Sequence, residues 1–170
     1  MIDSAEFRTA MSWVAAPVVV VTATADDRAH GTTISAFSSL SLDPPMVSIA
    51  LDRGSDLLAM LRATNHFGVN LLASDQQAIA TRFARKGPDK FADLSWTSDQ
   101  GVPRLPDTAG WLVCTAESYL DGGDHVIVLG LVEHVEYNRR PPLVYHDRTF
   151  LTCGPITEEH AETGAATARV

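Results

Sequence analysis

Four of the thirteen basic side chains lie in one short segment of an acidic chain, at Arg82, Arg85, Lys86 and Lys90. Guanidinium and ammonium groups gathered in this way can bind the phosphate or pyrophosphate of a nucleotide. Charge clusters are more often solvated loops that balance neighbouring acids. The segment therefore predicts an anion site only if other residues also point to a nucleotide.

Hydroxyl side chains are concentrated between Gly31 and Ser41, where six of eleven residues are Thr or Ser. Such hydroxyls, together with free backbone amides, can hydrogen-bond the polar edge of a heterocycle or a phosphate. The same residue types also satisfy their own backbone in an ordinary turn. Both interpretations stay open for this segment alone.

A histidine stands at the start of a long apolar run, in the sequence Gly122-Gly123-Asp124-His125. Beside a carboxylate, its imidazole can donate or accept a hydrogen bond at the rim of a cleft. The alternative is a turn histidine that has no functional role.

Several familiar kinds of site are not indicated. The chain has no G-x-G-x-x-G after a strand, no P-loop and no G-x-S-x-G, so it carries no motif for a Rossmann domain, for phosphoryl transfer or for a serine hydrolase. Its histidines and cysteines form no H-x-x-x-H or C-x-x-C pair, which gives a zinc site little support. Cys114 and Cys153 are predicted to be reduced thiols buried in the core.

The elements that must position these residues are mostly strands, with three short helices. An amphipathic helix over 4–14, capped by Ser4, ends before Pro17. Ser55 precedes a second helix, and Ser74 with Gln77 has capping-box spacing ahead of a third. Segments 38–45 and 85–108 are expected to be loops. The predicted strands cover residues 17–25, 30–37, 46–52, 66–72, 111–120 and 125–137, with one or two short strands in 142–153.

Most successive strands are linked too closely for βαβ crossovers, so the mainly β class and a closed or partly closed antiparallel barrel are predicted. The length fits one domain over residues 1–156, followed by a poorly ordered tail at 157–170. A net charge of −8 argues against a nucleic-acid or anionic-membrane binder. No apolar run is long enough for a membrane helix and the N-terminus does not read as a secretory signal, so a cytoplasmic protein is expected.

The chain resembles the short-chain flavin reductase family from about residue 7 to residue 153. The resemblance rests on motifs that occur in the family's order: F-R-x-x-M at 7–11, V-V-T-A at 20–23, G-T-T-x-S-x-F-x-S-x-S-x-D-P-P at 31–45, N-x-L at 70–72, F-A with K-x-x-D-K-F at 83–91, G-D-H at 123–125 and P-L-V-Y at 142–145. The segment at 31–45 is the most specific of them.

This resemblance implies an FMN-binding split β-barrel with a Greek-key-like antiparallel topology. It implies an NAD(P)H:flavin oxidoreductase that reduces FMN or FAD by hydride transfer, using NADH or, alternatively, NADPH. It also implies a homodimer and a partner monooxygenase that receives the reduced flavin. The chemistry belongs to the two cofactors, so the protein needs to supply positioning and electrostatics rather than a nucleophile or a metal.

The resemblance implies roles for individual residues as well. His125 is expected to touch the nicotinamide or the edge of the flavin. The residues expected to bind flavin are Thr32, Thr33, Ser35 and Ala36 at the ring and ribityl chain, Ser38 and Ser39 nearer the phosphate, Asp52, Arg53 and Ser55 as further contacts, Arg82, Phe83 and Lys90 at the phosphate, and Tyr145 near the bound cofactor. Ala36 and Phe150 depart from the family pattern, because many members carry a hydroxyl at each position.

Two other functions stay open. One is a split-barrel carrier or sensor that binds flavin or haem with little turnover. The other is an oxidase that retains its flavin and oxidises a small substrate directly.

Overall fold

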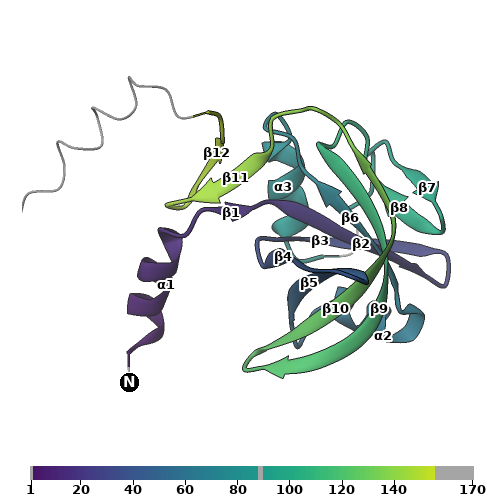
Figure 1. Cartoon of the computed structure of the whole chain (residues 1–170), viewed down its shortest axis with the longest axis horizontal. Helices are drawn as coiled ribbons and strands as arrows, with labels where there is room; N and C mark the ends of the chain where they lie inside the picture. Colours follow the sequence, from purple (N-terminus) through teal and green to yellow (C-terminus); the bar gives the residue numbers. More distant parts are fainter. Residues whose placement is uncertain (1, 88–89, 156–170) are drawn as a thin grey trace, which may run out of the picture.

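The computed structural model describes residues 2–87 and 90–155 (Figure 1). The expected tail at 157–170 lies outside the described residues. Within them the chain forms three helices and twelve strands, in agreement with the predicted mainly β class. The elements are α1 (Ser4–Ser12), β1 (Ala16–Pro17), β2 (Val19–Ala25), β3 (Arg28–Ile34), β4 (Phe37–Leu42), β5 (Pro45–Asp52), α2 (Asp56–Thr64), β6 (His66–Leu71), α3 (Gln77–Ala84), β7 (Thr97–Asp99), β8 (Val102–Arg104), β9 (Gly110–Gly122), β10 (His125–Tyr137), β11 (Leu143–His146) and β12 (Thr149–Thr152).

Seven strands form one antiparallel sheet in the order β3-β2-β6-β9-β10-β5-β4. Its longest hairpin joins β9 to β10, thirteen residues each, through a turn in which Gly123 has a φ of +70°. A left-handed backbone of this kind favours glycine, which has no Cβ to clash. A second sheet has the order β1-β11-β12, and β7 pairs with β8.

A closed or partly closed barrel was expected, and closure is not found: the large sheet is open, and no ladder among the described residues joins its edge strands β3 and β4. The two edges nevertheless meet at one corner, because only Ser35 and Ala36 separate β3 from β4. After this corner Phe37 pairs with Ile49 of β5 instead of turning back onto β3. The chain therefore curls the sheet without closing it.

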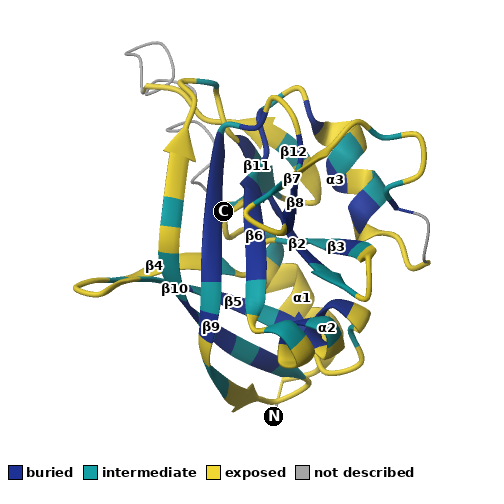
Figure 2. Ribbon diagram, turned by 90° about the vertical axis from the view of Figure 1, so that its right-hand side faces the viewer, coloured by how far each residue is buried: buried dark blue, intermediate teal, exposed yellow. Residues whose placement is uncertain are grey.

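Strand β2 is buried on both faces, which explains its run of valines. Val19 and Val21 pack in a large core with residues of α2, β5, β6, β9 and β10. Val20, with the preceding Val18, packs in a second core with Ala80 and Phe83 of α3. Figure 2 shows the buried stretches of β6 and β9. Because both faces are apolar, the strand reads as a continuous hydrophobic run rather than an alternating one.

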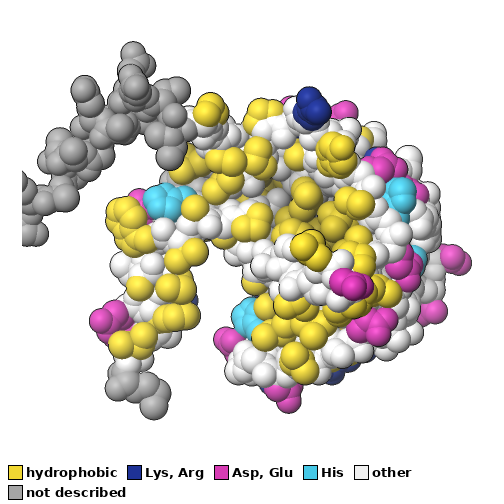
Figure 3. Space-filling view, viewed as in Figure 1, with side chains coloured by type: hydrophobic (Ala, Val, Ile, Leu, Met, Phe, Trp, Pro, Cys, Tyr) yellow, Lys and Arg dark blue, Asp and Glu magenta, His cyan; other side chains and the backbone are white. Residues whose placement is uncertain are grey.

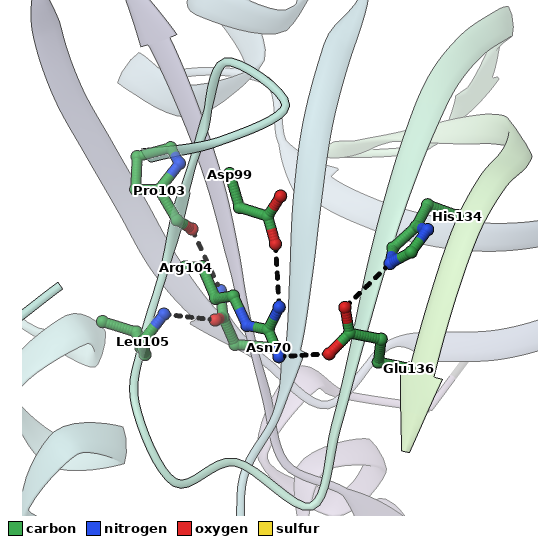
Figure 4. A network of polar contacts seen from close by, with 7 residues as sticks. All are labelled: Asn70, Asp99, Pro103, Arg104, Leu105, His134 and Glu136. Carbon is green, nitrogen blue, oxygen red and sulfur yellow. Dashed lines mark hydrogen bonds and ion pairs between the residues drawn. The ribbon is translucent and has the colours of Figure 1, made fainter. Parts of the chain in front are cut away.

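Polar contacts hold the β7–β8 hairpin against the sheet (Figure 4). The buried Asn70 of β6 accepts a hydrogen bond from the backbone N–H of Leu105 at 2.7 Å and donates its side-chain N–H to Val20 O at 3.2 Å. Arg104 of β8 forms ion pairs with Asp99 at 2.8 Å and with Glu136 of β10 at 2.5 Å. The hairpin is thus clamped to both β6 and β10.

Two segments expected to be loops contain strands. Residues 38–45 belong mostly to β4 and to the start of β5, because an edge strand tolerates the polar residues that suggested a loop. Segment 85–108 contains β7 and β8, joined at Gln100 and Gly101, which both have positive φ. Such a turn is typical of a tight hairpin.

Helix termini also differ from the prediction. Asp3, not Ser4, caps α1, since its carboxylate accepts the N–H groups of Ala5 and Glu6 at 2.8 Å. Helix α3 begins after Gln76, whose side chain binds Ala73 N and Pro106 O, so the expected Ser74 cap is not formed. Ser55 occupies the N-cap of α2, but its side chain makes no capping bond.

The two cysteines lie in different environments. Cys114 is completely buried in the large core, as expected, and burial raises the pKa of its thiol to about 12. Cys153 is exposed, which corrects the prediction of two core thiols. It follows β12, a short strand near the end of the described chain with mostly exposed residues.

Helix α1 projects from the body of the molecule together with the β1-β11-β12 sheet (Figure 1). It has no buried residue, and Phe7, Met11 and Val14 are each about half exposed. Figure 3 shows apolar side chains gathered around the recess between this arm and the body.

Candidate functional site

A cavity of about 370 Å³ lies between the end of β3, helix α3 and the turn from β11 to β12. We refer to it as the ring cavity. Hydroxyl groups, two aromatic rings and one cation line it, from Thr33, Ser35, Thr81, Tyr145, Phe150 and Arg148. The rings of Tyr145 and Phe150 lie 5.2 Å apart, centroid to centroid. A cavity of this composition suits a flat heterocycle with a polar edge.

The threonines of β3 tie this strand to α3. Thr33 Oγ1 donates to Ala80 O at 2.7 Å, and Thr32 Oγ1 is 3.5 Å from Phe83 O. Each hydroxyl oxygen keeps lone pairs that can accept a further hydrogen bond. Ser35, at the corner between β3 and β4, is among the residues of the ring cavity, so the structure brings Thr33 and Ser35 together with Tyr145.

A second cavity, of about 960 Å³, lies along α3 and the basic segment that follows it. We refer to it as the basic cavity, and Thr81 lines both it and the ring cavity. Its cations are Arg82, Arg85, Lys86 and Lys90. The structure therefore places a hydroxyl-lined pocket next to a strongly positive one, which is the arrangement that a ring bearing a phosphate requires.

The four cations of the basic cavity differ in what they can bind. Arg82 donates to Ala92 O, and the buried Lys90 donates to Gly31 O and Phe83 O, both at 2.9 Å. Burial lowers the pKa of Lys90, and the charge of Asp56 partly opposes this effect. In the described part of the chain Arg85 and Lys86 make no hydrogen bond or ion pair with side chains, so they are the cations most available to an anion.

Phe83 is completely buried, with its ring 5.0 Å from that of Phe91. Its carbonyl accepts the hydrogen bonds of Lys90 and Thr32. The residue thus fixes the basic segment against β3, and its side chain does not face either cavity.

Ser38 and Ser39 lie away from the ring cavity. They line a separate, mostly apolar groove of about 330 Å³, beside Phe37, Pro17 and Leu143. Ser38 Oγ donates to Ser39 O at 2.9 Å.

The remaining predicted residues form a group at the β9–β10 turn. Register pairs His125 with Asp52, and Arg53 donates from Nε to Gly123 O at 2.7 Å and pairs with Asp121 at 2.8 Å. His125 Nδ1 is 2.8 Å from Asp124 Oδ1. This hydrogen bond lowers the pKa of Asp124, with a smaller electrostatic contribution from the same histidine.

The start of α2 connects this group to the basic segment. Ser55 precedes Asp56, whose charge acts on both Lys90 and His30 of β3. Burial and the charge of Lys90 lower the pKa of His30. His125 itself is not among the residues that line the two cavities.

Comparison with known proteins identifies the family. The sequence model of the protein family described as flavin reductase like domain matches residues 11–154. The chain belongs to this family.

Related flavin reductase-like proteins cover most of the chain. The reductase component of a 4-nitrophenol 4-monooxygenase/4-nitrocatechol 2-monooxygenase of Rhodococcus opacus is 38% identical over 149 residues, 88% of this chain and 80% of that protein. An NADH:riboflavin 5'-phosphate oxidoreductase of Streptomyces pristinaespiralis is 38% identical over 156 residues, 89% of each. The crystal structure of nitrilotriacetate monooxygenase component B from Mycobacterium thermoresistibile has a TM-score of 0.86 at 29% identity, covering 90% of this chain and 88% of that one.

The cavities of this flavin reductase-like domain fit a flavin. Hydroxyls and aromatic rings line the ring cavity, and the adjoining cations suit a phosphate. In residues 2–87 and 90–155 no cluster of three or more His, Cys, Asp or Glu side chains is arranged to hold a metal ion. The same residues include no helix with the length and apolarity needed to cross a bilayer.

Two polar residues of the ring cavity, Thr81 and Arg148, were not predicted from the sequence. It noted Arg85 and Lys86 in the charge cluster without assigning them a role. Thr81 faces the cavity from the middle of α3, and only the docking of α3 onto β3 reveals this position. Arg148 follows the P-L-V-Y motif by three residues, so the motif was the available signal.

Proposed function

We propose that this protein is an NADH-dependent flavin reductase that supplies reduced flavin to a partner monooxygenase. The observation that carries the proposal is that relatives 38% identical over most of the chain are named as a monooxygenase reductase component and as an NADH:riboflavin 5'-phosphate oxidoreductase. The ring cavity and the basic cavity support it, because together they offer sites for a heterocycle and for a phosphate. FMN or FAD is the flavin, and NADPH is an alternative reductant.

In this proposal the corner between β3 and β4 binds the flavin ring through Thr32, Thr33, Ser35 and Ala36, with Tyr145 beside it. A bound flavin supplies the redox chemistry, since its ring accepts a hydride from a reduced nicotinamide. The residues of the chain hold the two rings in place and exclude water from between them. Ser38, Ser39, Asp52, Arg53 and Ser55 remain proposed flavin contacts, and His125 remains the proposed nicotinamide contact.

Arg82, Phe83 and Lys90 organise the phosphate end of the site. Lys90 and Phe83 act largely through the backbone contacts that fix the basic segment. Arg85 and Lys86 make no side-chain hydrogen bond or ion pair within the described residues, so we assign them to the phosphate. A site in which only some of the cations bind the phosphate is consistent with a flavin that is bound reversibly. A micromolar dissociation constant corresponds to about 8 kcal/mol, which a few charged and ring hydrogen bonds can supply.

The proposed assembly is a homodimer of split barrels in the cytoplasm. The half-exposed apolar side chains of α1 support a second copy as the partner of this helix. A groove of about 690 Å³ runs between α1 and residues Ser35, Ala36 and Tyr145, so such a partner would lie beside the ring cavity.

The experiment is an anaerobic mixture of the protein with NADH and an excess of FMN, followed by filtration that retains the protein. The proposal expects the visible absorbance of the flavin to bleach and the reduced flavin to appear in the filtrate. An oxidase that keeps its flavin would bleach only the bound fraction. A carrier or sensor would leave the absorbance unchanged, and either of these results would contradict the proposal.

A further inference from the structure

Arg148 is the one cation among the residues that line the ring cavity. It also lines the adjoining groove under α1, where the other cation, Arg8, is hydrogen-bonded to its own helix at Ser4. In the described residues no carboxylate lies within ion-pair distance of the Arg148 guanidinium, and no hydrogen bond occupies it. A charged group that has no partner among the described residues therefore lies at a pocket lined in part by hydroxyls and aromatic rings.

The backbone at this position is unfavourable for arginine. His146 pairs with Thr149, so Asp147 and Arg148 form a two-residue turn, with φ of +45° and +58°. Two positive φ values are typical of a type I′ turn, in which the second residue is usually glycine. A side chain in this left-handed region costs on the order of 1 kcal/mol. The turn thus keeps an arginine where glycine would be the more stable choice.

The turn is also fixed in its orientation. The backbone N–H of Asp147 donates to Ser12 O at 2.6 Å, and the ring of His146 lies 5.7 Å from that of Trp13 in an edge-to-face contact. These contacts anchor the turn to the end of α1. Arg148 is therefore presented to the ring cavity by a braced hairpin rather than by a free loop.

Arg148 and the basic cavity lie at different places along the site. Thr81, on α3, is the residue that the two cavities share. Of the two cavities, Arg82, Arg85 and Lys86 line only the basic one, and Arg148 lines only the ring cavity. A flavin whose phosphate is bound by the basic cavity thus brings its ring, not its phosphate, to Arg148. This placement rests on the proposed function.

We propose that Arg148 binds the flavin ring and stabilises the negative charge that the ring gains on reduction. The C4–H bond of the reduced nicotinamide breaks, its electron pair and hydrogen form the N5–H bond of the flavin, and NAD⁺ leaves. The transfer adds one negative charge to the ring when no proton follows from water. A guanidinium beside the ring favours this charged product and the transition state that leads to it.

The test compares Arg148→Gln with the wild type for FMN and for riboflavin, which has the ring but no phosphate. Dissociation constants are measured without NADH, for the oxidised flavins and for the same flavins reduced anaerobically with dithionite. We expect reduced FMN and reduced riboflavin to bind about 10- to 100-fold more weakly to the variant, and the oxidised forms to change much less. The kcat for NADH-dependent reduction falls with both flavins, and Arg148→Lys restores part of the loss.

Two further variants make the result interpretable. Arg148→Gly removes the guanidinium but suits the left-handed turn, so it should keep or raise the melting temperature while showing the same binding defect. Arg139→Gln removes an exposed arginine that lines neither cavity and should leave all of these quantities unchanged.

Three outcomes overturn the inference. Equal weakening of oxidised and reduced FMN with no effect on riboflavin would assign Arg148 to a phosphate. Unchanged binding and kcat in Arg148→Gln would leave it without a role at the flavin. An altered KM for NADH alone would place it at the nicotinamide nucleotide. A failure of the proposed function looks different from these three outcomes, because in that case the wild-type protein itself does not reduce flavin with NADH.

Discussion

One ring nitrogen of His125 is hydrogen-bonded, and within the described residues the other has no partner. Its Nδ1 lies 2.8 Å from the Asp124 carboxylate, so the neutral ring donates there and leaves Nε2 as an acceptor. Arg53 braces the same turn through Gly123 O and Asp121. The turn can therefore present an oriented imidazole to a nicotinamide, whose carboxamide N–H is a suitable donor.

We expect His125→Ala to lower kcat/KM for NADH by about 10-fold or more, because it removes one oriented hydrogen bond. The dissociation constant of FMN should stay within about 2-fold of the wild-type value, since the ring and basic cavities are intact. Steady-state kinetics and fluorescence titration of FMN measure the two quantities. Loss of FMN binding in this variant would contradict the assignment of His125 to the nicotinamide.

The basic cavity separates structural cations from available ones. Lys90 is buried and bonded to two carbonyls, whereas Arg85 and Lys86 line the cavity without a side-chain partner in the described residues. The charge cluster was visible in the sequence. Which of its members are free depends on how the segment docks onto β3, and no local pattern reveals this.

The double variant Arg85→Ala, Lys86→Ala should weaken FMN binding by about 10-fold, because two charges near the phosphate are lost. The dependence of the dissociation constant on salt should flatten for the same reason. Titrations at several salt concentrations measure both effects. Arg62→Ala, Arg139→Ala makes the same change in net charge at exposed positions that line neither cavity. An equal effect in this control would show that only the overall charge of the protein matters.

At the scale of secondary structure, most strands were predictable, including the short pair β11 and β12, whereas β4 and the β7–β8 hairpin were not. Strands β9 and β10 carry long apolar runs on both sides of Gly122-Gly123, so their bounds agree closely with the prediction. Strand β4 was read as a loop because an edge strand pairs on one side only and carries serines. Hairpin β7–β8 depends on Arg104, whose partner Glu136 lies on a distant strand.

The ion pair between Arg104 and Glu136, which attaches this hairpin to β10, predicts that the stability of the protein depends on pH. The hydrogen bond from Arg104, with a smaller one from His134, lowers the pKa of Glu136 from 4.5 to about 2. A lowered pKa means that the contribution to stability is complete above about pH 4.5 and is lost as the pH falls towards 2. The difference in free energy of unfolding between the wild type and Glu136→Gln should therefore shrink over this range.

Chemical denaturation at several pH values measures this difference. Glu117→Gln, at an exposed carboxylate on β9 that has no ion pair in the described residues, is the control and should show a nearly constant difference. If the difference in free energy of unfolding between the wild type and Glu136→Gln stays constant from pH 6 to about pH 2, the Arg104–Glu136 ion pair does not stabilise the protein.

At the scale of the whole molecule, an open sheet and an exposed helix occur on the same side. The sheet was expected to form a closed or partly closed barrel, because closure removes edge strands. Instead its edges meet only at Ser35 and Ala36, and the arm formed by α1 and β11–β12 projects beside them. Local sequence patterns predict strands but not the pairing of β4 with β5 rather than β3. The family resemblance indicated the fold more fully than any pattern of alternation.

The apolar face of α1 predicts a dimer that depends on this helix. Phe7→Ser, Met11→Ser should shift the protein from dimer to monomer, because stable interfaces bury on the order of 800 Å² per partner around an apolar centre. Light scattering after size-exclusion chromatography measures the mass. Glu6→Ser, on the same helix but outside the groove, should leave the dimer intact. A monomeric wild-type protein at micromolar concentration would contradict the proposed assembly.

The proposed flavin reductase activity is tested most simply by the rate at which a catalytic amount of protein consumes NADH as FMN is added. We expect many equivalents of NADH to be consumed per protein and the rate to saturate with FMN or FAD, since the flavin is proposed to be a diffusible substrate bound by the ring and basic cavities. The loss of NADH absorbance in the near ultraviolet measures the rate. If the protein binds flavin but shows no turnover with either flavin, with NADH or with NADPH, it is not the flavin reductase that we propose.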